Sequence, residues 1–165
     1  MTRFFLLSLT TCLVLLLGAA KPVSDQQLRP ITPTTVCDLS ANPERYANLE
    51  SLVRVRAFIL SDLKHSTLLA DAECEKAGVS LQSGDFKDRP IDLVNDTNYK
   101  KLEELHPRIP ELLRKGQKVY GTFEGLFQWH PENAPRGPLR ILVLRQVTDL
   151  HVGERDDPKY ALRER

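Results

Sequence analysis

Four histidines are the side chains of this sequence best suited to hold a metal ion or to transfer a proton: His65, His106, His130 and His151. They lie far apart and form no H-x-H or H-x-x-x-H spacing, in which two imidazoles reach one ion. The sequence also contains no G-x-S-x-G, P-loop or G-x-G-x-x-G motif. We therefore predict no catalytic residue, no metal site and no cofactor, and we expect a protein that is not an enzyme.

Two segments rich in turn-forming residues carry side chains typical of ligand contacts. One contains His65, and the other opens with Trp129, the only tryptophan of the chain, followed by His130 and Arg136. An indole ring beside hydrogen-bonding groups can stack on a sugar or a base, or anchor a peptide. The alternative is that the ring of Trp129 folds inward and closes one end of the core.

Arg54 and Arg56 alternate with apolar residues in the segment SLVRVRAFIL, residues 51–60. This period of two predicts a strand whose arginines point outward. The pair is either a local basic patch that contacts a ligand or an ordinary solvated surface. No acidic cluster beside it completes a nuclease centre.

Residues 1–20 (MTRFFLLSLTTCLVLLLGAA) combine one basic residue, a long apolar run and small residues at the end. This pattern predicts a secretory signal peptide cleaved after Ala20, with a retained membrane anchor as the alternative. Cleavage removes Cys12 and leaves Cys37 and Cys74. Because an even pair of cysteines in an exported chain favours a disulfide, we predict a Cys37–Cys74 bond and a periplasmic or secreted protein.

The charge balance disfavours one class of partner. The chain has 23 Lys and Arg against 22 Asp and Glu, and removal of Arg3 with the signal peptide leaves 22 of each. A nucleic-acid-binding protein usually has a clear basic excess. We therefore consider nucleic acid an unfavoured partner, and we expect no stable membrane span after cleavage.

Five segments are predicted to be strands because they are rich in apolar and β-branched residues and are bounded by turn residues. In the fourth, Gly121 and Gly125 suit a barrel corner or a close backbone approach. The Ile-Leu-Val-Leu centre of the fifth indicates burial on both faces or a bulge. The predicted strands are residues 51–60, 67–71, 79–82, 118–128 and 139–152.

Short helices are predicted before the first of these strands. Thr34 or Thr35 can cap one of them, and Asn42, which precedes a proline, starts another. The second is expected to bring Tyr46 and Leu49 to the core.

A further helical region lies between the third and fourth predicted strands. Pro107 and Pro110 do not fit inside one straight helix, so two short helices with a break near His106 are expected, the second ending at Gly116. Helical spacing is shown by the apolar residues Tyr99, Leu102, Leu105, Ile109 and Leu112.

The order strand, strand, strand, helix, strand, strand is that of the oligonucleotide/oligosaccharide-binding (OB) fold, a five-stranded Greek-key barrel. We predict an OB-fold-like domain, mainly β with α, over residues 36–152, with a helical insertion between strands 3 and 4 and a short N-terminal helical segment. Residues 21–35 are an extended lead-in and residues 153–165 a charged tail. The alternative is an open sheet with one inserted helix.

The motifs V-C-D-L, N-P-E-R-Y and V-R-V-R occur early in the chain, L-L-A-D-A-E-C in the middle, and G-T-F-E-G and L-R-I-L-V-L-R-Q-V-T-D-L late. Together they resemble small exported bacterial OB-fold proteins that lack assigned chemistry. The resemblance covers roughly residues 34–150. It implies the fold and a periplasmic or extracellular location, and it implies no active-site residues.

Binding is the function that these observations favour. Ligands of OB folds cross strands two and three, between the loop joining strands one and two and the loop joining strands four and five, here residues 61–66 and 129–138. We expect an exported, non-enzymatic module for a glycan, a peptide or an envelope protein. The alternatives are single-stranded nucleic-acid binding, and a hydrolase or nuclease whose site is not visible in the sequence. The candidate binding residues are Arg54, Arg56, His65, Trp129, His130 and Arg136.

Overall fold

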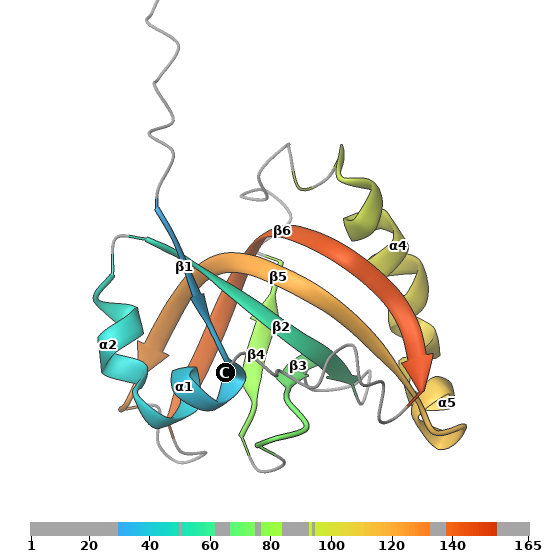
Figure 1. Cartoon of the computed structure of the whole chain (residues 1–165), viewed down its shortest axis with the longest axis horizontal. Coiled ribbons are helices and arrows are strands. Elements are labelled where there is room, and N and C mark those ends of the chain that lie inside the picture. Colours follow the sequence, from blue (N-terminus) through green and yellow to red (C-terminus); the bar gives the residue numbers. More distant parts are fainter. Residues whose placement is uncertain are drawn as a thin grey trace, which may run out of the picture.

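Strands and short helices pack around a main hydrophobic core in the computed structural model of the chain, and Figure 1 shows how these elements are arranged. The strands are β1 (Ile31–Thr34), β2 (Leu52–Ser61), β3 (Thr67–Ala70), β4 (Val79–Gln82), β5 (Gln117–His130) and β6 (Leu139–Glu154). The structure describes residues 30–49, 51–61, 67–74, 77–83, 93, 95–132 and 138–154.

The strands form a closed barrel with the predicted connectivity. Neighbours follow the order β2, β3, β4, β6 and β5, and β5 pairs again with β2. The pair β4–β6 is parallel, and the other barrel pairs are antiparallel. The OB-fold-like prediction is therefore confirmed, and the open sheet is wrong.

A short strand that the sequence did not predict, β1, lies in the segment expected only to be an extended lead-in. It runs parallel to the start of β2, with Ile31 opposite Leu52 and Thr34 opposite Val55. The carbonyl of Pro30 accepts a hydrogen bond from the backbone amide of Leu52 at 3.0 Å. Pro33 within β1 and Pro30 just before it made this strand hard to predict, because proline lowers strand propensity but is tolerated at a sheet edge.

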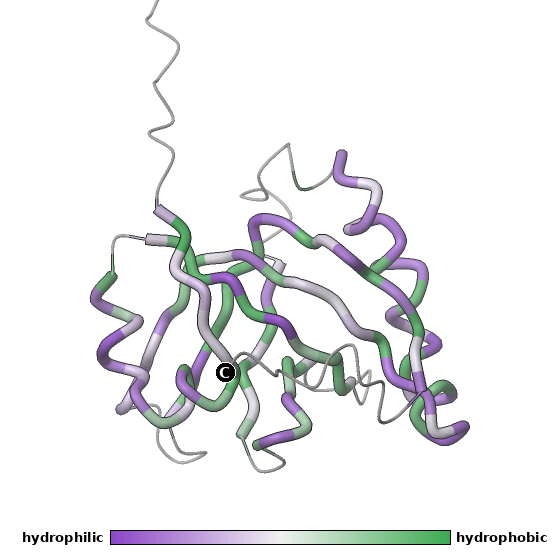
Figure 2. Tube along the Cα trace, viewed as in Figure 1, coloured by the Kyte–Doolittle hydropathy of each residue, from purple (hydrophilic) through white to green (hydrophobic). Residues whose placement is uncertain are grey.

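The alternation predicted for β2 is present. Val53, Val55 and Ile59 are fully buried, whereas Arg54 and Arg56 are exposed. Figure 2 shows this alternation of hydrophobic and hydrophilic positions along β2. One side of the strand therefore faces the barrel interior. The main core also takes side chains from the other barrel strands and from the helices, among them Leu39, Leu69, Val79, Tyr99, Leu102, Ile109, Phe123, Leu142 and Val147.

Two short helices precede the barrel, α1 (Val36–Ala41) and α2 (Pro43–Ala47). Thr35 caps α1, because its hydroxyl accepts a hydrogen bond from the Asp38 amide at 3.0 Å. Tyr46 is buried as predicted, but Leu49 is 38% exposed, so the prediction that it enters the core is wrong. The reason is that α2 ends at Ala47, two residues before Leu49.

The helical insertion consists of α4 (Thr97–Leu105), the 3-10 turn η1 (His106–Arg108) and α5 (Ile109–Arg114). The break near His106 is thus confirmed. Gly116, with φ of +75°, follows α5 and allows the chain to reverse into β5. Figure 1 shows α4 alongside β6, on the opposite flank of the barrel from α1 and α2. No helix in the described ranges is long and apolar enough to cross a membrane.

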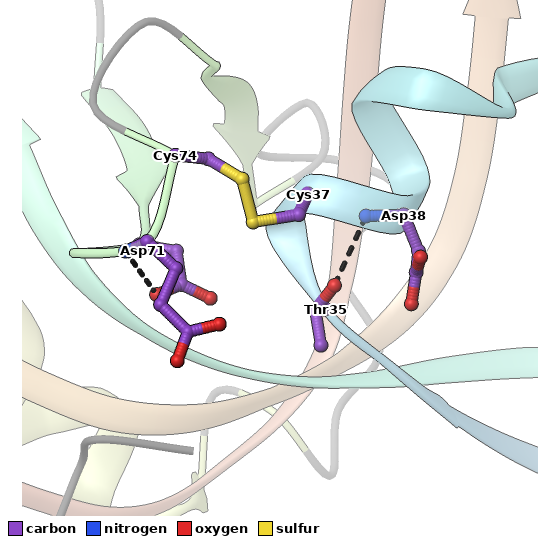
Figure 3. Close-up of a disulfide and its surroundings, with 6 residues drawn as sticks. Thr35, Cys37, Asp38, Asp71 and Cys74 are labelled. Atoms are coloured by element: carbon purple, nitrogen blue, oxygen red, sulfur yellow. Dashed lines mark hydrogen bonds between the residues drawn. A yellow bond between two sulfur atoms is a disulfide. The ribbon is translucent and has the colours of Figure 1, made fainter. Parts of the chain in front are cut away.

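The predicted disulfide joins Cys37 of α1 to Cys74, which lies in the turn after β3 (Figure 3). Their Cα atoms are 5.6 Å apart, and 37 positions separate them in the sequence. The bond therefore links the N-terminal helical segment to the hairpin of β3 and β4.

A β-bulge next to Gly125 bends the long pair of β5 and β6. The pairing register shifts between Glu124 and Gly125, and a Cβ atom at Gly125 would lie 2.3 Å from the carbonyl oxygen of Val143. The close backbone approach expected from this glycine is thus confirmed.

We predict that Gly125→Ala destabilises the protein by at least about 2 kcal/mol, because the backbone of β6 has to move away from the new methyl group. The matched control is Gly78→Ala, whose Cβ would meet its nearest neighbour at an ordinary 3.5 Å. Urea unfolding measures both changes in the free energy of unfolding. Equal losses for the two variants would contradict the role of the bulge.

We also predict that replacing both Cys37 and Cys74 by serine lowers the free energy of unfolding by roughly 3–4 kcal/mol, because opening a loop of this length restores entropy to the unfolded chain. Urea unfolding of the wild type with and without reductant provides the same comparison without mutation. An unchanged midpoint in both experiments is the result that would exclude a stabilising disulfide.

Candidate functional site

A cavity of about 430 Å³ lies between the helical insertion and the barrel, and we call it the α4 pocket. This volume is within the range of about 300–1,000 Å³ typical of ligand sites. Both polar and apolar side chains line it, and they come from α4, η1, β3, β4 and β6. The described lining residues are Thr67, Leu81, Ser83, Tyr99, Leu102, Glu103, His106 and Leu144.

The position of α4 follows from its cap and its apolar stripe. The Asp96 carboxylate accepts a hydrogen bond from the Tyr99 amide at 2.8 Å and so caps the helix. Tyr99 and Leu102 are buried, and Lys101 Nζ donates to the Leu150 carbonyl of β6 at 2.9 Å. Glu103 follows directly on this stripe and lies at the pocket.

The imidazole of His106 joins the helical insertion to two barrel strands. Its Nε2 lies 2.7 Å from Thr67 Oγ1 and 3.2 Å from Ser61 Oγ, and these two hydroxyl oxygens are 3.5 Å apart. When Nε2 is unprotonated, the Thr67 hydroxyl can donate to its single lone pair, and the Ser61 hydroxyl can donate to Thr67 Oγ1. Ser61 and Thr67 flank the first loop predicted to bind ligand, so these bonds fix both ends of that loop against η1.

Apolar side chains form another part of the pocket wall. Leu102 and Leu144 are buried, and Leu81 is half-buried against the main core. Ser83 adds a hydroxyl group just after the end of β4. The pocket therefore offers apolar contact together with hydroxyl, imidazole and carboxylate groups.

The two predicted arginines lie on the outer side of β2, away from the lining of the α4 pocket, and differ in their contacts. Arg54 Nε donates to Glu124 Oε1 of β5 at 2.6 Å. The Glu124 side chain is only 6% exposed, whereas that of Arg54 is 46% exposed. Arg56 is exposed and lies opposite Thr122 in the register. Arg54 thus compensates a buried carboxylate, and a ligand-binding role of either arginine stays a prediction.

Trp129 and His130 belong to β5, so the prediction that they open a loop is wrong. They pair with Arg140 and Leu139 of β6, and this pairing extends β5 beyond residue 128. Trp129 is half-buried against the main core, and the Arg140 guanidinium carbon lies 5.2 Å from its ring centre. The inward packing that the sequence left open is therefore present, while His130 is exposed.

Two of the predicted binding residues, His65 and Arg136, lie outside the described residues. His151 stacks on Tyr120 of β5 at 5.7 Å, on the outer side of the barrel. Among the residues that the structure describes, no group of three or more His, Cys, Asp or Glu side chains is arranged to hold a metal ion.

His106, Thr67 and Glu103 were not predicted to belong to a binding site. One feature of the sequence could have indicated the site. Tyr99, Glu103 and His106 are spaced four and three positions apart, which places them on one face of a helix. The contact of His106 with Ser61 and Thr67 spans 45 and 39 positions. Only the closed barrel brings these residues together.

Comparisons of the chain with protein-family models, with curated proteins and with solved structures find no match. The resemblance to exported OB-fold proteins therefore stays a prediction.

We predict that Arg54→Met lowers the free energy of unfolding by about 1–3 kcal/mol, because it leaves the buried Glu124 carboxylate without its charged partner. Arg56→Met is the matched control, with an expected change within about 0.5 kcal/mol. Urea unfolding of both variants tests this difference. If the two variants lose the same free energy, the pair with Glu124 does not stabilise the barrel.

Proposed function

We propose that this protein is an exported, non-enzymatic binding module and that its ligand occupies the α4 pocket. The observation that carries the proposal is the position of the pocket. It adjoins β3 and β4, the second and third strands of the closed barrel, across which ligands of OB folds lie. Its mixed lining is typical of ligand sites, in which a few polar groups orient a ligand on apolar walls.

The hydrogen bonds of His106 support binding because they hold the pocket wall in place before any ligand arrives. Thr67, which lines the pocket, is tied through Nε2 to Ser61 and to η1. A preformed site loses less side-chain conformational entropy when it binds a ligand. The proposed site is therefore held by hydrogen bonds on the side of β3.

Export is supported by two independent features. Residues 1–20 have the pattern of a signal peptide, and the chain contains the Cys37–Cys74 disulfide. Disulfides persist in oxidising compartments and are rare in the cytosol. The proposed location is thus periplasmic or extracellular.

Blocking the pocket tests the proposed function. Ser83→Trp places a large side chain at the pocket, and Gln82→Trp is the matched control because Gln82 is exposed at the end of β4 and does not line the pocket. A fragment library is screened by saturation-transfer NMR, with circular dichroism as the check on folding. We expect the wild type and Gln82→Trp to bind the same fragments, and Ser83→Trp to bind them at least tenfold more weakly.

Two results would overturn the proposal. One is the absence of any binding fragment at millimolar concentration, and the other is a set of fragments that Ser83→Trp binds unchanged. Turnover of an ester library that is lost in His106→Ala would replace the binding module with a hydrolase, one of the alternatives that the sequence left open.

A further inference from the structure

We infer that Trp129 and Arg140 form a second binding site, separate from the α4 pocket, and that its ligand carries an oxyanion, a carboxylate or a phosphate group. The two residues lie opposite each other in the pairing of β5 with β6. Neither belongs to the described lining of the α4 pocket. The inference therefore goes beyond the proposed function.

The side chains of this pair carry two buried N–H groups that lack an acceptor. Trp129 Nε1 and Arg140 Nε are both shielded from solvent, and neither has a hydrogen-bond partner within the described part of the chain. Buried polar groups are nearly always hydrogen-bonded, because an unpaired donor loses its bonds with water and gains none in return. Two such donors on facing residues therefore indicate a place for the acceptor of a ligand.

The guanidinium group of Arg140 adds a positive charge at the same place. Its central carbon lies 5.2 Å from the centre of the Trp129 ring, and the described residues offer it no ion pair. The face of the indole attracts the cation, but it leaves the N–H groups at the edge of the guanidinium without an acceptor. A water molecule would accept a hydrogen bond without balancing the charge, whereas an oxyanion does both.

Other arginines show how unusual this environment is. Arg54 Nε donates to the Glu124 carboxylate at 2.6 Å, and Arg114 Nε donates to the carbonyl of Pro110. Arg145, on the same strand as Arg140, is exposed, so water reaches its N–H groups. Burial without an acceptor therefore distinguishes Arg140 from these three arginines.

A carboxylate or phosphate group matches the donors of the pair. The N–H groups of a guanidinium form a planar fork that binds two oxygens side by side, and Nε–H is one arm of this fork. The same oxygens keep further lone pairs, which can accept from the indole N–H. Trp129 and Arg140 are half-buried, so a ligand reaches them after a small movement of the Arg140 side chain. Charge-assisted hydrogen bonds are strong at such partly desolvated places.

The single tryptophan of the chain makes the site directly observable. In the isotope-labelled full chain, its indole N–H gives one NMR resonance, whose position changes when Nε1 gains a hydrogen bond. The probes are benzoate and phenyl phosphate, and benzamide is the uncharged control of nearly the same shape as benzoate. We expect at least one of the two oxyanions to shift the indole resonance and to bind at least about tenfold more tightly than benzamide. The tighter of the two distinguishes a carboxylate ligand from a phosphate ligand.

Two variants and a matched control locate the binding. Arg140→Met keeps an unbranched side chain but removes the fork and the charge, so it should weaken oxyanion binding at least about tenfold. Arg145→Met, which removes the exposed arginine of the same strand, should leave the affinity unchanged. Trp129→Phe keeps an aromatic ring without the N–H group and should also weaken binding, measured by the shift of the Leu139 amide. Urea unfolding confirms that each variant is folded.

Four results would overturn the inference. They are an indole resonance that does not move at millimolar probe concentration, equal affinity for benzamide and both oxyanions, equal binding by the wild type and a folded Arg140→Met, and shifts confined to the amides of Thr67 and Ser83, which would place the probe in the α4 pocket.

The Ser83→Trp variant separates this inference from the proposed function. It should leave the oxyanion affinity unchanged, because Ser83 lines the α4 pocket and not the pair of Trp129 and Arg140. A failed fragment screen together with a shifted indole resonance would remove the α4 pocket and keep the oxyanion site. The reverse pair of results would remove the oxyanion site and keep the α4 pocket.

Discussion

The structure depends on the pairing of β2 with three other strands. Its first half pairs with β1 and its second half with β3, while β5 pairs along most of its length from Val53 to Ile59. Because β5 overlaps both of the other partners, β1 and β3 must share the opposite edge of β2. This arrangement closes the barrel and places successive side chains of β2 alternately in the core and outside it.

Closure also creates the proposed site. The end of β2 and the start of β3 present Ser61 and Thr67 to one imidazole of the helical insertion, so that η1 is fixed where β2 turns into β3. On the other side, Lys101 ties α4 to β6. The pocket therefore lies between the barrel and a helical insertion that is hydrogen-bonded to it at two places, through Lys101 and through His106, as a preformed binding site requires.

The sequence predicted much of the fold because the features that decide it are local. The period of two around Arg54 and Arg56 predicted β2 and its outer side, and the prolines around His106 predicted the break between α4 and α5. The same local reasoning failed for β1, because this four-residue segment contains a proline and is too short to show a clear strand pattern, and its pairing with β2 is not visible in the sequence. It failed for Leu49 because α2 is shorter than its sequence pattern suggested.

The site was less predictable because it is made of distant residues. The sequence directed attention to Trp129, yet the strand continues through this residue and its ring packs on the core beneath Arg140. His106 was predicted to mark the helix break and to belong to no site, since nothing local connects it to Ser61 and Thr67. Residues that a barrel brings together across about 40 positions leave no spacing signal in one sequence.

The most direct test of the proposed site is to map amide chemical-shift changes of the labelled protein during titration with a bound fragment. We predict that the largest changes occur at Thr67, Ser83, Glu103 and His106, which line the α4 pocket. Changes centred on Arg56 or His130, with these four amides unmoved, would contradict it.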